Sequence, residues 1–207
     1  MAKHMEVQAA TFDFTGNYLC LDFSNTLHDR STTPRESLNS YDDFVQWGQE
    51  AGILAENEAT RLRAEATRHP NEAESVRQQA ITLREVMYRI FYARLQNVSA
   101  EESDLATLNA MLARAMTKAS IHSTGDGFAW DWSSEDGELE RIYWPIVRSA
   151  AELLTAEELE SVRMCAAEDC GWLFLDTSKN HTRRWCDMKS CGNRAKARKH
   201  YKKAQEV

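Results

Sequence analysis

The chain has 207 residues, of which 43% are hydrophobic, and a formal net charge of −7. This length suffices for one sizeable core and a small appended module. No apolar run reaches the roughly eighteen residues that a membrane span needs, and the N-terminus has no apolar core of the secretory type. We therefore expect a cytoplasmic protein without a membrane segment.

The first 150 residues are predicted to be mainly helical. Helices are expected over 42–48, stopped near Gly52, and over 57–69, ended before Pro70. A long helix is expected over 71–97, because apolar residues recur there at steps of three and four. These residues are Val76, Ala80, Leu83, Met87, Ile90 or Phe91, and Leu95. Ser103 is expected to cap the helix that follows.

A two-stranded hairpin is predicted next. Segments 120–123 and 128–132 alternate around Thr124-Gly-Asp-Gly, a good turn sequence, with both tryptophans of the second strand expected to cover core. A helix over 137–154 follows, with a bend at Pro145. Thr155 and Glu158 then have the spacing of a capping box that would open a short helix.

Two cysteine pairs near the C-terminus have the spacing of metal ligands. They are Cys165-x4-Cys170 and Cys186-x4-Cys191, separated by fifteen residues. Four thiolates suit one tetrahedral zinc ion if the chain between the pairs folds back. We expect strand 172–175 to pair with 182–185 for this purpose, and Trp172 and Trp185 to pack the small core of this module.

Alternatives for these cysteines are four reduced packing residues or disulfides. The odd Cys20 and the missing signal segment disfavour disulfides, and Cys20 itself sits in an apolar context typical of a packing residue. Four cysteine ligands would close the zinc site, so the metal is expected to be structural. Because the six histidines are scattered and no nucleophile or phosphate-loop motif occurs, no enzymatic activity is expected.

The C-terminal motif resembles a known family. Cys165-Ala-Ala-Glu-Asp-Cys-Gly-Trp-Leu-Phe-Leu-Asp followed by Arg183-Arg-Trp-Cys-Asp-Met-Lys-Ser-Cys-Gly-Asn-Arg resembles the CGNR-type zinc finger of bacteria. Upstream, Leu21-Asp-Phe-Ser-Asn-Thr-Leu and Trp144-Pro-Ile-Val-Arg-Ser-Ala-Ala-Glu-Leu-Leu resemble the ABATE domain that precedes this finger. The resemblance implies a stress-induced transcription regulator. The expected fold is mainly α with a small β-hairpin: a helical regulatory domain over 1–154 and, over 155–207, a zinc-ribbon-like finger that ends in a basic helix.

Charge is segregated along the chain. Residues 179–207 carry ten Lys or Arg against two acids, a charge of +8, so the remaining 178 residues carry −15. A basic end on an acidic body is typical of a domain that contacts nucleic acid through that end. Asn193 is expected to cap a basic helix over 194–203. The predicted DNA contacts are Arg183, Arg184, Lys189, Arg194, Lys196, Arg198, Lys199 and Lys202.

Other partners remain open at this point. The basic end could instead be a solvated tail, dock on an acidic protein, or bind RNA. Polar residues inside apolar runs are candidates for binding a small-molecule signal: Asp22, Asn25, Thr26, Arg30 and Arg84, with internal hydrogen bonding as the alternative role. One small finger buries little DNA surface, and a second copy would raise both affinity and selectivity. The protein is therefore a candidate homodimer.

Overall fold

The computed structural model describes residues 12–132 and 138–205, except for the side chains at 199, 200 and 202–205. The N-terminal part contains α1 (Leu19–Ser24), β1 (Leu27–His28), β2 (Arg35–Glu36), α2 (Tyr41–Glu50), α3 (Glu56–Arg68), α4 (Pro70–Leu95), α5 (Glu102–Met116), β3 (Ala119–Thr124) and β4 (Gly127–Trp132). The 3₁₀-helix η1 (Leu139–Ile142), α6 (Tyr143–Thr155), the 3₁₀-helix η2 (Glu157–Ser161), β5 (Val162–Met164), β6 (Leu173–Leu175), the π-helix η3 (Met188–Gly192) and α7 (Asn193–Gln205) follow.

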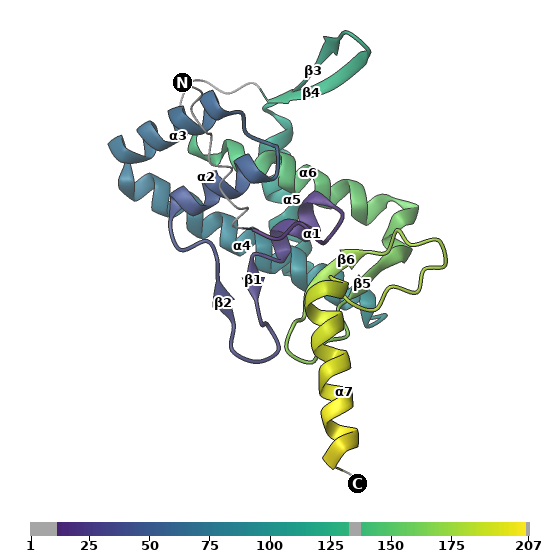
Figure 1. The fold of residues 1–207 in the computed structure, drawn as a ribbon. Coiled ribbons are helices and arrows are strands. Elements are labelled where there is room, and N and C mark those ends of the chain that lie inside the picture. The colour runs from purple at the N-terminus through teal and green to yellow at the C-terminus, as the bar shows by residue number, and fades with distance from the viewer. Residues whose placement is uncertain (1–11, 133–137, 206–207) are drawn as a thin grey trace, which may run out of the picture.

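The long helix α4 runs through the centre of the helical body and contacts α1, α2, α3, α5 and α6 (Figure 1). Its predicted stripe is confirmed, since Val76, Ala80, Leu83 and Met87 are buried in one continuous core. Pro70 occupies the first turn, where a missing N–H costs nothing. Among the described helices, none is long and apolar enough to cross a membrane.

Three predicted helix boundaries were wrong. Ser103 lies inside α5, whose N-cap is Glu101. The helix predicted over 137–154 is divided into η1 and α6, and Pro145 lies in the first turn of α6. Thr155 ends α6 and donates to the carbonyls of Ala151 and Glu152, so it forms no capping box, and η2 follows.

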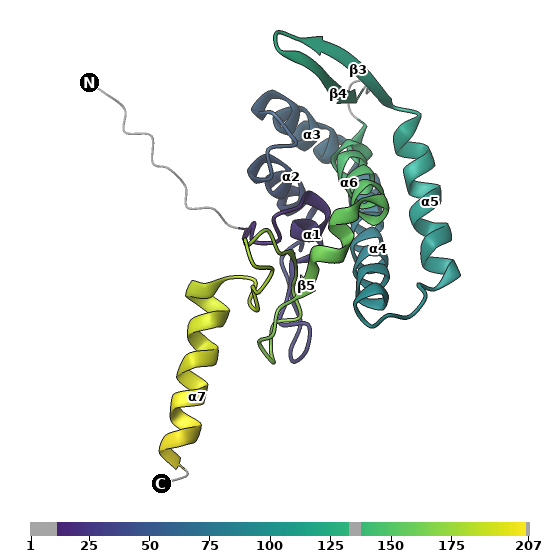
Figure 2. The same cartoon turned by 90° about the vertical axis from the view of Figure 1, so that its right-hand side faces the viewer.

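The predicted hairpin is confirmed as the β3–β4 pair, with Gly125 and Asp126 in its turn. Trp132, at its base, packs against Trp144 of α6. Trp130 was expected to cover core as well, but it remains 42% exposed because the ribbon projects away from the body (Figure 2).

The strand pairing predicted for the finger was wrong. Strand β6 pairs antiparallel with β5, through Leu173↔Met164 and Val162↔Leu175, and not with 182–185. The segment after β6 is organised instead by the buried carboxylate of Asp176, which accepts hydrogen bonds from the backbone N–H groups of Ser178 and Arg183.

The finger and the helical body share backbone and side-chain hydrogen bonds. The amide of Asn25 bonds both backbone groups of Leu173, with distances of 2.8 Å from Nδ2 to the carbonyl oxygen and 2.9 Å from the Leu173 nitrogen to Oδ1. The Trp172 indole donates to the Leu27 carbonyl, and the Tyr88 hydroxyl donates to the Gly171 carbonyl. These bonds hold β6 against α1 and α4.

A buried arginine ties β2 to α4. Arg84 is 2% exposed and donates to both carboxylate oxygens of Glu36, at 2.6 and 2.7 Å, and to Glu85 at 2.8 Å. Burial raises the pKa of Glu36, but hydrogen bonding to Arg84 and to the backbone outweighs it and holds that pKa below its ordinary value. The pair is therefore ionised at neutral pH.

Replacing Arg84 with alanine should lower the free energy of unfolding by about 3–5 kcal/mol, because it leaves Glu36 partly buried without its cation. Arg68, exposed in a pair with Glu65, is the matched control, for which alanine should cost less than about 1 kcal/mol. Urea unfolding followed by circular dichroism measures both. Equal losses in the two variants would contradict a stabilising role for the Arg84 cluster.

Candidate metal centre and nucleic-acid interface

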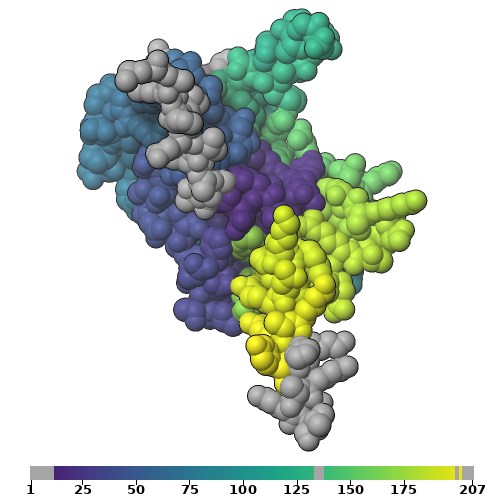
Figure 3. Space-filling model, in the orientation of Figure 1, coloured from purple at the N-terminus to yellow at the C-terminus, as the bar shows by residue number. Residues whose placement is uncertain are grey.

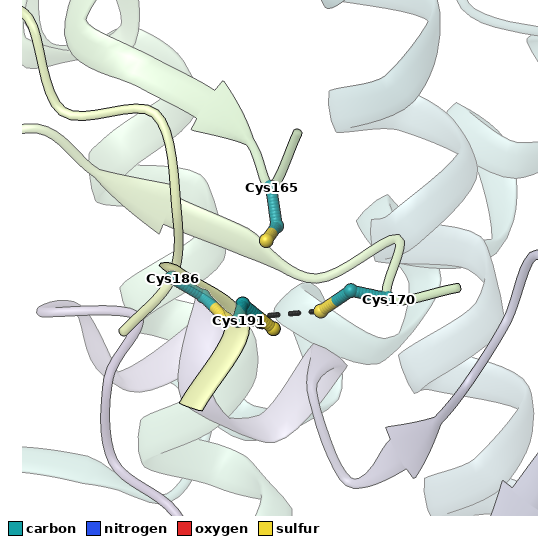
Figure 4. A group of neighbouring side chains, drawn as sticks. All are labelled: Cys165, Cys170, Cys186 and Cys191. Atoms are coloured by element: carbon teal, nitrogen blue, oxygen red, sulfur yellow. Dashed lines mark hydrogen bonds between the residues drawn. The ribbon is translucent and has the colours of Figure 1, made fainter. Parts of the chain in front are cut away.

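Four cysteines from separate segments converge at the finger. Cys165 follows β5, Cys170 precedes β6, Cys186 lies in the loop between β6 and η3, and Cys191 lies in η3 just before α7 (Figure 4). Their Sγ atoms all lie within 4.8 Å of one another, with 3.7 Å between Cys170 and Cys186 and 3.6 Å between Cys186 and Cys191. Sulfurs at the corners of a zinc tetrahedron with bonds of about 2.3 Å are about 3.8 Å apart.

This donor set fits one structural zinc ion. All four cysteines are buried, and four sulfur ligands leave a tetrahedral ion without an open position. Hydrogen bonding with Cys170 and Cys186 lowers the pKa of Cys165, whereas hydrogen bonding with Cys165 raises the pKa of both Cys170 and Cys186. The contacts among the thiols therefore favour the thiolate at Cys165, and a bound metal would hold Cys170 and Cys186 as thiolates.

Backbone geometry explains the glycines of the finger. Gly171, directly after Cys170, has φ +72, and a Cβ there would lie 3.1 Å from the Cβ of Arg30. A Cβ on Gly192 would lie 2.5 Å from the sulfur of Met188. The positive φ makes glycine the favoured residue at position 171, whereas at position 192 the contact is with the flexible, 42% exposed Met188 side chain, which can shift.

The turn into α7 is capped by a residue that sequence reasoning missed. The carboxylate of Asp187 accepts the backbone N–H of Ser190 at 2.8 Å, whereas Asn193 donates its side-chain amide to the Lys189 carbonyl. Asn193 is thus not the N-cap that was predicted. The helical path begins five residues earlier, as a π-turn that carries Cys191, and the Asp at the start of this turn is the signal that could have revealed it.

A second small core surrounds the metal centre. Trp172 and Phe174 are buried beside the four cysteines, and Trp185 packs against them, which confirms the prediction that both tryptophans pack the finger. Arg183 lies over the Phe174 ring at 4.3 Å and donates to the carbonyls of Thr15 and Trp185. Arg183, proposed from sequence as a DNA contact, therefore has internal partners and joins the finger to the N-terminal segment.

The other basic candidates for DNA contact differ in their surroundings. Arg184, Lys189 and Lys196 are at least partly exposed. Arg194 and Arg198, one helical turn apart, face the loop between Cys165 and Cys170, where Arg198 donates to Asp169 at 2.8 Å. The Lys199 and Lys202 side chains lie outside the described part of α7.

Arg194 also contacts the metal centre. Its guanidinium donates to Cys191 Sγ at 3.1 Å and lies 3.6 Å from Asp169. Burial raises the pKa of Asp169, yet the hydrogen bond from Arg198 and the nearby arginines hold it below its ordinary value. The loop therefore presents a carboxylate to α7 at neutral pH.

The candidate signal-binding residues all have partners inside the protein. Asp22 accepts the Gly16 N–H at 2.7 Å, and burial raises its pKa to about 6. Thr26 donates to the Phe23 carbonyl, and Arg30 donates to Glu85 and lies over the Tyr88 ring at 3.9 Å. Thr26, Arg84 and Arg30 are joined in one network through Glu85, whereas Asp22 and Asn25 bond separately to the backbone of Gly16 and Leu173. Sequence reasoning missed its partners Glu36, Glu85 and Tyr88, because no local pattern marks residues that pair across long separations.

A cavity of about 220 Å³ lies between the finger and the β1–β2 hairpin. Its lining combines charged and polar groups of the body, including Asp13, His28 and Arg35, with residues of the finger. The finger contributes Ser190, Arg194 and the metal-ligand candidates Cys170, Cys186 and Cys191, so part of this space is the place of the metal ion. The Thr15 hydroxyl, which also lines it, is buried and makes no hydrogen bond within the described structure. This volume is below the roughly 300–1,000 Å³ of sites for drug-sized ligands.

Replacing Cys186 with serine should abolish stoichiometric zinc binding and unfold the finger, because metal binding supplies on the order of 10–16 kcal/mol to such modules. Cys20→Ser is the matched control, since Cys20 is buried in the helical core away from the metal centre and should leave zinc content unchanged. Metal analysis of the purified proteins measures this difference. Full zinc occupancy in Cys186→Ser would contradict the ligand assignment.

The comparisons with known proteins agree with this geometry. The model of the ABATE family, described as "putative stress-induced transcription regulator", matches residues 17–157, and the CGNR zinc finger model matches residues 161–204. None of the curated proteins compared with the chain matches it. The first match spans well over half of the chain, and the second contains all four clustered cysteines. The chain therefore belongs to the ABATE family and carries a CGNR zinc finger after its helical domain.

Proposed function

We propose that this protein regulates transcription by binding duplex DNA through its zinc finger and α7, and that it has no catalytic activity. The observation that carries the proposal is the position of α7, which projects away from the body while the turn that leads into it holds a metal ligand (Figures 1 and 3). A helix held at one end by a metal centre and exposed along its length can enter a major groove.

The charges of α7 support contact with phosphates. Lys196 lies on a different side of the helix from Arg194 and Arg198, since two residues advance the helix by about 200°. Lys189 and Arg184 add positive charge at the end of α7 next to the metal. In the proposed complex, Lys196 faces the DNA. Arg194 and Arg198 leave the carboxylates of Asp169 and Glu168 and pair with DNA phosphates instead.

The carboxylates of Asp169 and Glu168 compete with DNA for these arginines. Arg198 lies 2.8 Å from Asp169 and 3.9 Å from Glu168, and its side chain is 46% exposed. A partly exposed ion pair of this kind contributes little stability, so phosphate can replace it. The loop between Cys165 and Cys170 would thus lower the affinity of α7 for nonspecific DNA without preventing DNA binding.

Control by a signal is part of the proposal. The cavity between the β1–β2 hairpin and the finger is where a small polar molecule would touch both domains. Such a ligand can shift the finger only if its affinity differs between two arrangements. A small metabolite that raises the melting temperature of the wild type and changes its DNA affinity should lose both effects in Arg35→Ala.

A second candidate function is docking of α7 on an acidic protein. The observation that favours it is that Arg194 and Arg198 already bind carboxylates in this chain. RNA binding is the remaining alternative to duplex DNA.

Selection from a random duplex library and from fragments of the protein's own genome, at physiological salt, distinguishes these functions. The zinc-loaded protein should retain fragments that share a sequence motif. Retention without sequence preference, or preference for RNA of matched length, would contradict the proposal.

Substitution of Lys196 on α7 and of Asp169, the loop residue that pairs with Arg198, should have opposite effects. Lys196→Ala should weaken DNA binding severalfold and reduce the slope of log K against log salt by about 0.9, because one phosphate contact is lost. Asp169→Asn should tighten binding by releasing Arg198. Arg68→Ala, which removes a positive charge on the body, is the control and should change neither the DNA affinity nor the salt slope. Fluorescence anisotropy over a salt series, with zinc content checked, measures these effects. Unchanged affinity in Lys196→Ala would remove that residue from the interface.

A further inference from the structure

The β3–β4 ribbon projects from the body at the end opposite α7 (Figures 1 and 2). Within the described residues, the two strands pair only with each other, so the outer edge of each strand is open. A two-stranded ribbon on its own is marginally stable in water and gains stability from packing on one face. Its body contact is at the base, where Trp132 meets Trp144.

One face of the ribbon is apolar. The register places Ile121 opposite Trp130 and Ser123 opposite Phe128, so these side chains lie on the same face as Trp132. Phe128 is 80% exposed and Ile121 63% exposed. A row of large apolar side chains therefore continues from the core outward along the ribbon, as is typical of an interaction surface.

The two ends of this face carry opposite charges. At the base, the guanidinium of Arg148 from α6 lies 4.7 Å from the Trp130 ring centroid. Its Nε and Nη1 are buried and make no hydrogen bond within the described structure, and the side chain as a whole is 22% exposed. Glu152, one turn along α6, is 3.5 Å from Nη1. At the tip, the turn residue Asp126 is exposed.

We propose that the apolar face of the β3–β4 ribbon is a homodimer interface, in which a second copy packs antiparallel about a two-fold axis. A two-fold axis brings the tip of each ribbon over the base of the other, so Asp126 of one copy meets Arg148 of the next. The same rotation lays Phe128 against the tryptophans at the partner's base. The face itself carries no ionisable side chain, so two copies meet without opposing like charges.

The available area fits a second copy. From the exposed fractions of Ile121, Phe128 and Trp130, two copies would bury roughly 700 Å² of these side chains, given about 150–250 Å² for a buried aromatic residue. Neighbouring strand residues and Arg148 bring the contact to about 1,000–1,200 Å², the lower end of specific interfaces. An interface of this size is typical of a weak and reversible dimer.

Because the ribbon and α7 lie at opposite ends, dimerisation leaves both basic helices exposed (Figure 3). A dimer of this form can hold two separate DNA segments or two distant sites, and its linkage makes the second binding event effectively intramolecular. The interface is independent of whether the finger binds DNA, so each of the two proposals can fail without the other.

Sedimentation velocity of the full-length, zinc-loaded protein over a wide concentration range tests the interface. The wild type should pass from monomer to dimer, and Phe128→Asp should raise the dimer dissociation constant at least about tenfold. Val98→Asp, which places the same charge at another exposed apolar position, should dimerise like the wild type. A wild type that stays monomeric at all concentrations, or a Phe128→Asp dimer as tight as the wild type, would overturn the proposal.

A charge exchange tests the antiparallel arrangement itself. Asp126→Arg and Arg148→Glu should each weaken self-association, because each opposes like charges at both ends of the face. Mixing the two variants should restore dimers. In the mixed dimer, the introduced arginine of one copy meets the introduced glutamate of the other, and the native pair of Asp126 with Arg148 is kept at the opposite end. Restoration also shows that neither variant is misfolded. If the mixture stays as monomeric as its components while circular dichroism shows both to be folded, the two-fold arrangement is wrong.

Discussion

The two hydrogen bonds between the Asn25 amide and the backbone of Leu173 are the contact on which the finger's position depends. Leu173 begins β6, two residues after Gly171, so this bond pair sets where Cys170 enters the metal centre. The amide serves as a partner for one open edge of the β5–β6 pair, and it satisfies backbone groups that are buried beneath the body. The metal centre and Asn25 therefore both fix the position of β6. Loss of the metal should weaken the Asn25 hydrogen bonds, and loss of the Asn25 side chain should weaken metal binding.

This arrangement has a consequence for regulation. Two of the polar residues proposed as ligand contacts also bond the finger: the Asn25 side chain, directly after α1, to Leu173, and the Arg30 backbone, after β1, to the Cys170 carbonyl. The Leu27 carbonyl of β1 accepts a third bond, from Trp172. The proposed signal, if bound in the adjacent cavity, would touch residues of both the β1–β2 hairpin and the finger. Asp169 and Glu168 contact the first turns of α7, while the rest of this helix projects away from the acidic body, so the charge segregation of the chain is retained in space (Figure 1).

Much of the helical body was predictable, because its longest helix, α4, buries a periodic stripe, whereas the short α1, buried at five consecutive positions, was not predicted. The four zinc ligands were predictable as well, since cysteine pairs at this spacing have few other uses. The strand partner of β6 was not. Segment 182–185 is close in sequence, but β5 contacts α4 and buries Val162 in the core of the body, and that burial outweighs the shorter loop. The capping roles of Ser103, Thr155 and Asn193 failed for a related reason, because a suitable side chain caps a helix only where tertiary packing starts one.

The sequence by itself determined the zinc-ligand set, the helical character of the body, the hairpin turn and the concentration of positive charge in the last 29 residues. These features depend on residue type and local spacing, which are read along the chain. Only the tertiary structure decided which charges are engaged, as with Arg183 bonded to Thr15 and Arg84 bonded to Glu36. It also decided that Ile121, Phe128 and Trp130 stay outside the core. Partners that are 48 or 168 residues apart leave no periodic trace in a sequence, so packing alone selects them.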